Sequence, residues 1–129
     1  MDRVNRDELI RRCAAGERNF AGFKLDGDLS GIDLSGADLT GNDMEEFYLA
    51  SAILKRVNLV NAKLFEACLD GTDLTKADLI GADLRRARLD VANLTNADLR
   101  GARFHNTRFH KANLIGANLS GTNLGGCDF

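Results

Sequence analysis

The sequence predicts an all-β solenoid, a parallel β-helix in which the chain turns once per repeat. From residue 29 onward every fifth residue is large and apolar, and the residue two positions earlier is usually small, with alanine at 12 of the 21 positions. On an α-helix residues five apart lie about 140° apart around the axis, so these apolar centres would define no stripe. On a flat strand they would alternate between faces. A chain that turns after each centre points all of them inward.

The repeat unit reads A(D/N)LxG, as in residues 77–84, Ala-Asp-Leu-Ile-Gly-Ala-Asp-Leu. It resembles the pentapeptide repeat family. The resemblance implies a right-handed quadrilateral β-helix with four repeats, about 20 residues, in each coil and about five coils in total. Residues twenty apart would then stack in columns. The four faces are numbered by their apolar centres: 29, 49, 69, 89, 109 and 129 on the first, 34, 54, 74, 94 and 114 on the second, 39, 59, 79, 99 and 119 on the third, and 44, 64, 84, 104 and 124 on the fourth.

Two stretches depart from the repeat. Leu25 to Leu29 is a step of four, which predicts a tight turn or an altered first coil at residues 26–28, with Gly27 adopting unusual backbone angles. Between residues 42 and 53, Asn42 and Phe47 occupy positions that favour small side chains. We expect a widened coil or a local turn change there, and the alternative is a ligand pocket.

The N-terminal segment predicts a helix. Residues 1–18 are expected to form a capping segment with a helix over about residues 6 to 15, and residues 19–129 the β-helix. The signals are a capping box at Asn5 and Glu8, a hydrophobic staple of Val4 and Leu9, and a stop at Gly16. Cys13 would be a buried small hydrophobic residue. No comparable cover is predicted beyond the last repeat, so the protein is expected to be a monomer or a weak end-to-end homodimer, which light scattering would detect.

Composition limits the cellular locations and the classes of binding partner that we expect for this protein. The net charge is −2, from 17 basic and 19 acidic residues, so charge does not favour nucleic acid or an anionic membrane. The charged start is unlike a signal peptide, and no apolar run is long enough to span a bilayer. Three scattered cysteines indicate reduced thiols. The sequence therefore predicts a cytoplasmic protein that binds neither a membrane nor nucleic acid.

No common catalytic motif is present. The nucleophile, zinc and phosphate signatures GxSxG, HExxH and GxxxxGK[ST] do not occur, so we expect no enzyme and no cofactor. His105 and His110 lie in a doubled Arg-Phe-His motif at the repeat period. Metal binding through them is an alternative, but their sequence neighbours Arg and Lys are not metal ligands, which favours a solvated pair.

Charge is unevenly distributed along the chain. Residues 26–46 hold seven acidic and no basic side chains, and residues 85–111 hold seven basic and two acidic ones. Arg88 and Arg108, which are twenty residues apart, would stack on one face, and other basic residues of this stretch would lie on the adjoining face, which together form a basic corner. We take this corner as a candidate patch for an acidic protein partner, with a solvated face as the alternative. The patch consists of Arg85, Arg86, Arg88, Arg103, His105, Arg108, His110 and Lys111.

Several apolar residues are also expected on the outside. Packing along a face explains them without a partner, and an interaction site is the alternative. They are Tyr48, Ile53, Val60, Phe65, Ile80 and Val91.

The leading hypothesis is a non-catalytic structural or protein-interaction module whose partner the sequence does not name. The resemblance also implies an alternative, since some family members mimic DNA and protect type II topoisomerases such as gyrase. Those members are longer and strongly acidic and join through a C-terminal module. This chain has a net charge of −2 and a basic stretch instead. A supercoiling assay with gyrase separates the two hypotheses.

Overall fold

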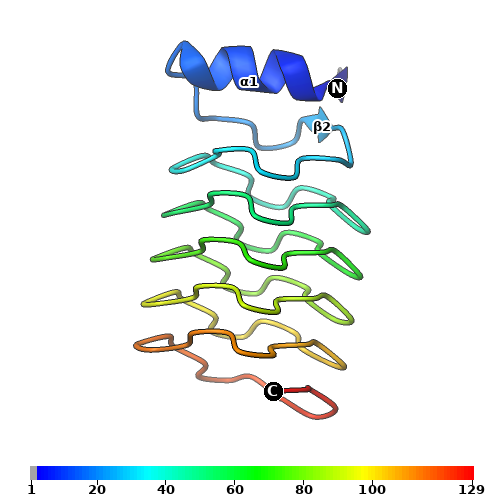
Figure 1. Cartoon of the computed structure of the whole chain (residues 1–129), viewed down its shortest axis with the longest axis vertical. Coiled ribbons are helices and arrows are strands. Elements are labelled where there is room, and N and C mark those ends of the chain that lie inside the picture. The colour runs from blue at the N-terminus through cyan, green and yellow to red at the C-terminus, as the bar shows by residue number, and fades with distance from the viewer. Residues whose placement is uncertain (1–2) are drawn as a thin grey trace.

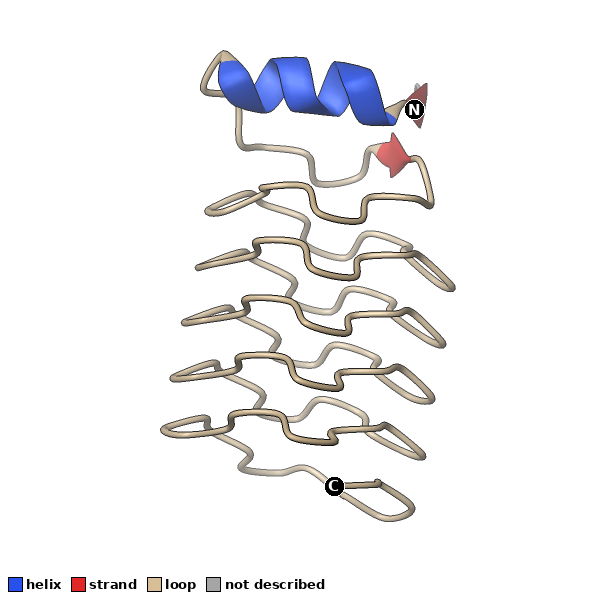
Figure 2. Cartoon of the chain, viewed as in Figure 1, coloured by secondary structure: helices blue, strands red, loops and turns tan. Residues whose placement is uncertain are grey.

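The chain forms a stack of four-sided coils closed at one end by a helix (Figure 1). A computed structural model describes residues 3–129, so residues 1 and 2 of the expected capping segment lie outside the described residues. Its regular elements are β1 (Arg3–Val4), α1 (Arg6–Ala14) and β2 (Lys24–Leu25). The rest of the chain is stacked turns and extended segments, shown in tan in Figure 2. No helix among the described residues has the length and apolar character needed to cross a bilayer.

Successive coils pair in parallel with a period of twenty residues. Asp73, for example, is the ladder neighbour of both Ile53 and Asn93. Its carbonyl accepts a hydrogen bond from the Leu54 N–H at 2.7 Å, and its N–H donates to the Ala52 carbonyl at 3.1 Å. The columns predicted by stacking repeats modulo twenty are therefore confirmed, and residues far apart in sequence share one outer face.

Each side of the coil ends in a β-turn closed by a hydrogen bond, such as the Ala77 N–H to the Leu74 carbonyl at 2.9 Å. The third residue of these turns has a positive φ at every fifth position from residue 31 to residue 126. Eleven of these residues are not glycine. The turn geometry thus recurs even where the side chain disfavours it.

The interior contains stacked leucines with alanines beside them. Leu34, Leu69 and Leu94 have no exposed surface, and Ala67 and Ala87 are equally buried. The two buried threonines are satisfied by backbone carbonyls: the Thr72 hydroxyl donates to Leu69 at 2.8 Å and the Thr107 hydroxyl to Leu84 at 2.6 Å. A polar side chain enters this core only where a carbonyl accepts its proton.

The capping helix α1 has the predicted signals. The side chain of Asn5 accepts the Glu8 N–H at 2.9 Å, and Val4 and Leu9 are both buried. After Ala14 the chain reverses at Gly16, which has φ +93°. Cys13 was expected to be buried, but it is only partly buried, because it packs at the margin where the helix meets the coils. Its incomplete burial still raises the pKa of the thiol above its ordinary value.

Two arginines fasten this end of the stack. In later coils the upward-facing carbonyls accept N–H groups from the coil above, as the carbonyls of Tyr48 and Ala50 do. Their counterparts Asp28 and Ser30 have no coil above them, and the Arg6 guanidinium donates to both carbonyls, at 3.3 and 2.7 Å. Arg18 donates to the Ser35 carbonyl in the same way, at 3.1 Å. The guanidinium groups thus replace a missing coil.

Replacing Arg6 with alanine is expected to lower the free energy of unfolding by about 1 to 2 kcal/mol, because two backbone carbonyls at the open end lose a charged donor. Arg11→Ala is the matched control: Arg11 is an exposed arginine of the same helix, outside the hydrogen bonds that fasten it to the coils, and its removal should cost less than about 0.5 kcal/mol. Urea denaturation measures both, and equal losses would show that Arg6 does not hold the helix.

The first coil is one residue short, as the step of four predicts. Asn19 is the ladder neighbour of Asp38, nineteen residues on, whereas Asp28 pairs with Tyr48, twenty residues on. The prediction for Gly27 was wrong, because its φ is not positive. Instead, a Cβ at Gly27 would lie 3.8 Å from the ring of Phe47. That is an ordinary van der Waals distance, so Gly27 lies against Phe47, which occupies a position that is usually alanine in the other repeats.

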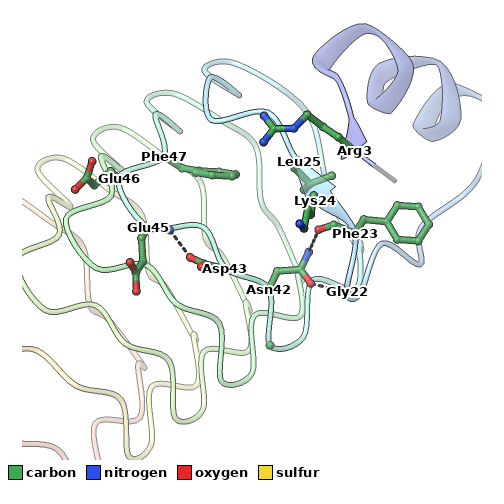
Figure 3. A pocket seen from close by; sticks show the side chains of 11 residues that line it. Arg3, Gly22, Phe23, Lys24, Leu25, Asn42, Asp43, Glu45, Glu46 and Phe47 are labelled. Atoms are coloured by element: carbon green, nitrogen blue, oxygen red, sulfur yellow. Dashed lines mark hydrogen bonds between the residues drawn. The ribbon is translucent and has the colours of Figure 1, made fainter. Parts of the chain in front are cut away.

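The expected turn change around residues 42–53 is also wrong. The Asn42 N–H donates to Leu39 at 3.1 Å and the Phe47 N–H to Met44 at 3.2 Å, which are the ordinary turn bonds. The irregularity lies in the first coil, because β2 pairs with β1 above it and not with the coil below. The alternative prediction of a pocket matches a cleft of about 720 Å³ lined by residues of both coils (Figure 3).

The coil that ends at Phe129 is less buried than the others. Leu114, Leu119 and Leu124 are only partly buried, and Phe129 is 61% exposed and stacks on Phe109 with ring centroids 5.2 Å apart. No described segment covers this coil. End-to-end pairing of two copies stays a prediction.

Candidate functional site

The eight residues of the candidate patch occupy two adjoining faces and the turns that follow them. Arg88 and Arg108 are ladder neighbours on the first face, and Arg103 is the ladder neighbour of Asp83 on the fourth. The turns after the fourth-face centres hold Arg85, Arg86 and His105, and the turns after the first-face centres hold His110 and Lys111. The stacking predicted for Arg88 and Arg108 is therefore confirmed.

Carboxylates from neighbouring coils interleave with the arginines of the first face. Arg88 pairs with Asp70 at 2.9 Å and lies 3.9 Å from Asp90, and Arg108 pairs with Asp90 at 2.8 Å. The carboxylates are fixed in turn, because Asp70 accepts the Asp90 N–H at 3.0 Å and Asp90 accepts the His110 N–H at 3.2 Å. The result is a ladder of alternating charge whose guanidinium groups have fixed positions.

The fourth-face turns contain a second cluster of arginines around Phe65. The guanidinium carbons of Arg85 and Arg86 lie 5.5 and 5.9 Å from its ring centroid, within cation–π range. Arg85 also donates two hydrogen bonds to Asp83, at 2.8 and 2.7 Å. These bonds hold the pKa of Asp83 below its ordinary value. Arg86 lies 3.6 Å from Glu66.

The patch is thus less positive than the sequence between residues 85 and 111 suggests. Arg103 also lies near a carboxylate, 4.0 Å from Asp83. The acids Glu66, Asp70 and Asp83 come from the preceding coil or the preceding strand, outside that stretch. Counting charge along the chain missed them, although twenty-residue stacking gives a signal, because it places Glu66 beside Arg86 and Asp83 beside Arg103. Among the arginines and the lysine of the patch only Lys111 has no ion pair within residues 3–129, and His105 has none there either.

The two histidines have separate surroundings. The Nε2 atom of His110 lies 2.8 Å from a carboxylate oxygen of Asp128. His105 lines a different cavity, of about 290 Å³, together with Arg85 and Arg103. In the part of the chain that the structure describes, no three His, Cys, Asp or Glu side chains are grouped to hold a metal ion. The geometry gives the metal alternative no ligand set.

Of the outer apolar residues expected from the sequence, two stand out by exposure, and Ile115, which was not among them, is 72% exposed. Tyr48 is 62% exposed and lies in the same column as Arg88 and Arg108, and Val91 is 64% exposed in the turn that follows Asp90. Ile53 is 38% exposed. The other three expected outer residues, Val60, Phe65 and Ile80, are partly buried.

Val91 has φ +61°, a left-handed conformation that β-branched residues rarely adopt. Replacing it with asparagine, which occupies the same turn position at residues 61, 96 and 106, is expected to raise the free energy of unfolding by about 1 kcal/mol. Val60→Asn, at a turn position without positive φ, is the control and should not stabilise. Thermal and urea denaturation measure both changes. A destabilised Val91→Asn protein would contradict the claim that the positive φ of Val91 strains the backbone.

Stability is expected to fall in acid. Thr40 hydroxyl and backbone bonds lower the pKa of Asp38, and the guanidinium of Arg100 lowers the pKa of Asp98. A carboxyl whose folded pKa is depressed stabilises the fold above its unfolded pKa of about 3.9, and this contribution is lost as pH falls through the folded pKa. Urea midpoints should be flat between pH 7 and pH 5 and decrease below pH 4. A midpoint that rises in acid would contradict this sign.

Comparison with known proteins agrees with the geometry. The family model of pentapeptide repeats matches residues 26–56, 48–79 and 92–129, with eight copies. The pentapeptide repeat protein Rfr23 from the cyanobacterium Cyanothece 51142 is 34% identical, with a TM-score of 0.57; the match covers 79% of this chain and 63% of Rfr23. The chain therefore spans less than two thirds of that protein's length.

Two further solved structures are similar. The pentapeptide repeat protein alr5209 from Nostoc PCC 7120 is 30% identical over 92% of this chain and 99% of its own, with a TM-score of 0.46. A trypsin-treated form of QnrB1, a plasmid-mediated fluoroquinolone resistance protein, is 24% identical over 86% and 68%, with a TM-score of 0.52. Among curated proteins, none matches the chain. The fold is the right-handed quadrilateral β-helix, and the chain belongs to the pentapeptide repeat family.

Proposed function

We propose that the protein is a non-catalytic interaction module of the cytoplasm whose first face binds a protein partner. The observation that carries this proposal is the column of Tyr48, Arg88 and Arg108, in which each guanidinium is backed by a carboxylate. The inward-facing residues pack in the core, and the turns are closed by backbone hydrogen bonds. The side chains of the outer columns are therefore the ones available to contact other molecules.

The arginines are suited to binding because they are held in place and still exposed. The side chains of Arg88 and Arg108 are 52% and 42% exposed, and each salt bridge uses only part of the guanidinium. The Nε atom of Arg108 is buried and has no hydrogen-bond partner among the described residues. Arginine and tyrosine dominate interface hot spots, and preorganised side chains lose less entropy on binding. A partner surface that carries carboxylates fits this column.

The test is quantitative capture from a soluble extract of the source organism, with the full chain as bait. A partner should be retained by the wild type and by a control with Lys55→Gln and Arg56→Gln, in the turn after the second face. Retention should fall by roughly fivefold or more in a variant with Arg88→Gln and Arg108→Gln, if each exposed arginine contributes about 1 kcal/mol. Urea denaturation verifies that the variants are folded. Equal retention by all three proteins would overturn the assignment of the first face.

The alternative of a DNA mimic that binds a type II topoisomerase rests on family resemblance. Its structural counterpart is the acidic stretch of residues 26–46, in which Asp33, Asp38 and Asp43 lie on successive faces of one coil. A gyrase supercoiling assay with the full chain distinguishes the alternatives. Strong inhibition that survives loss of Arg88 and Arg108 would favour the mimic.

A further inference from the structure

The hydrogen-bond ladder is interrupted on the fourth face between the first and second coils. In the next three coils the residue before the fourth-face centre donates its N–H upward, as Lys63 does to Asn42 and Asp83 does to Ala62, both at 2.9 Å. The carbonyls of Lys63 and Phe65 accept N–H groups from the coil above, at 2.8 and 2.9 Å. The corresponding groups of the second coil are the N–H and carbonyl of Asp43 and the carbonyl of Glu45. None of the three has a hydrogen-bond partner within residues 3–129.

The interruption arises because strand β2 of the first coil pairs with β1 on the side away from the second coil. β2 therefore leaves the ladder of the coil below. At one end of the gap, the Asn42 side chain takes the place of a backbone acceptor and receives the Gly22 N–H at 2.6 Å. At the other end the ladder resumes where the Tyr48 N–H donates to Gly27 at 2.7 Å. The resulting slot exposes one strand's length of unpaired edge.

The slot has an apolar base and charged walls (Figure 3). Leu25 and Phe47 line its base, and Figure 3 shows the Phe47 ring reaching toward Leu25, whereas the Phe23 ring points away from the slot and lies 5.4 Å from the Arg12 guanidinium of α1. The wall of the second coil carries Asp43, Glu45 and Glu46, whose carboxylates form no ion pair within the described part of the chain. The opposite wall carries Arg3 and Lys24, and Arg3 lies 3.9 Å from Asp26.

We propose that this slot binds an extended basic segment of another protein, which adds a parallel strand to the edge at residues 43–45. The strand would donate N–H groups to the carbonyls of Asp43 and Glu45 and accept the Asp43 N–H, as the coil above does elsewhere in the ladder. A volume of about 720 Å³ is within the range of ligand pockets. This site is separate from the first face and does not depend on the function proposed for it.

Charge complementarity selects a basic segment. The outward side chain of an added strand would become the ladder neighbour of Asp43. Two coils further along the same face, Asp83 has a basic ladder neighbour, Arg103, at 4.0 Å. Asp43 is exposed, and its Oδ1 already accepts the Glu45 N–H at 3.2 Å. The other carboxylate oxygen is open to a lysine or arginine of the segment.

The probe is a fluorescent hexapeptide with the sequence of residues 101–106, Gly-Ala-Arg-Phe-His-Asn, which forms a fourth-face strand in this protein. Asp43→Asn tests the charge, because asparagine keeps the turn bond, as Asn123 does at 2.9 Å to Gly125 in the same column. Asp38→Asn, on the third face, is the matched control. A peptide with Glu in place of Arg tests charge from the other side, and one with proline in place of Phe lacks a ladder N–H.

Fluorescence anisotropy should show binding of the basic peptide to the wild type and to Asp38→Asn. Binding should be weaker by roughly tenfold for Asp43→Asn and for the Glu peptide, and lost for the proline peptide. On binding, the Asp43 amide should become protected from hydrogen exchange in NMR spectra. Absence of binding, equal binding to Asp43→Asn and the wild type, or an unprotected Asp43 amide in the complex would each overturn the proposal.

Discussion

Replacing Leu69 with alanine is expected to lower the free energy of unfolding by about 3 to 5 kcal/mol. Leu69 is the first-face centre of a middle coil and has no exposed surface. It lies between the coils of Leu49 and Leu89, whose ladder bonds hold the walls in place. The walls cannot close over the missing atoms without breaking hydrogen bonds, so the substitution leaves a cavity in addition to the lost transfer free energy.

The matched control is Leu124→Ala. Leu124 is also an apolar centre, but it lies in the last coil and is only partly buried. Its loss should cost about 1 kcal/mol, because less apolar area leaves water and the site can relax. Urea denaturation followed by circular dichroism measures both variants. In a solenoid a middle coil is stabilised by two neighbouring coils and an end coil by one. Similar losses of stability in Leu69→Ala and Leu124→Ala would contradict this.

Replacing Asn42 with alanine is expected to cost about 2 to 3 kcal/mol, although asparagine is the wrong residue for the repeat. Asn42 is 3% exposed, receives the Gly22 N–H at 2.6 Å and donates to the carbonyl of Phe20 at 3.1 Å. Alanine restores the repeat pattern, but it leaves the Gly22 N–H without its acceptor and the buried Phe20 carbonyl with only the Phe23 N–H, at 3.1 Å. The repeat pattern alone predicts the opposite sign.

Asn113→Ala is the control, because the Asn113 side chain accepts only the exposed Ile115 N–H, at 3.0 Å, and its loss should cost less than about 1 kcal/mol. Urea denaturation gives the free energies, and hydrogen exchange should show faster exchange at Gly22 in Asn42→Ala. A stabilised Asn42→Ala protein would mean that the first coil settles onto the second without the amide.

The coiled core could be predicted from the sequence because one rule applies at every repeat. An apolar centre every fifth residue fixes the inward direction, and stacking by twenty then assigns columns such as Arg88 with Arg108. The capping helix was equally predictable, since the Asn5 and Gly16 signals are local. These features depend on short-range patterns that recur or that have a known chemistry.

The ends of the stack could not be predicted in the same way. The pairing of β1 with β2 depends on which edge of the first coil the N-terminal residues reach, and two residues in each strand carry no periodic signal. The roles of Arg6 and Arg18 depend on carbonyls that only the folded edge exposes. Long-range contacts of single side chains lie outside any repeat rule.

The candidate patch was predicted in position but not in charge. Its arginines stack as expected, yet Asp70 and Asp90 neutralise much of the first face. These acids stack on each other in the column beside that of the arginines, so the error came from summing charge along the chain instead of across neighbouring columns. The slot at residues 43–45 results from missing backbone hydrogen bonds between two coils, and no residue type in the sequence predicts such a gap.

That residues twenty apart form one outer column is tested most directly by joining two of them. Cys68 is the ladder neighbour of Arg88 on the first face, so Arg88→Cys would place two thiols on adjacent strands about 4.8 Å apart. A short bifunctional thiol reagent, followed by digestion and mass spectrometry, measures the crosslink. We predict a crosslink from residue 68 to residue 88 in this variant and none from residue 68 to residue 93 in the control Asn93→Cys on the second face. Equal yields in both variants, or none in Arg88→Cys, would contradict the columns on which the interaction face rests.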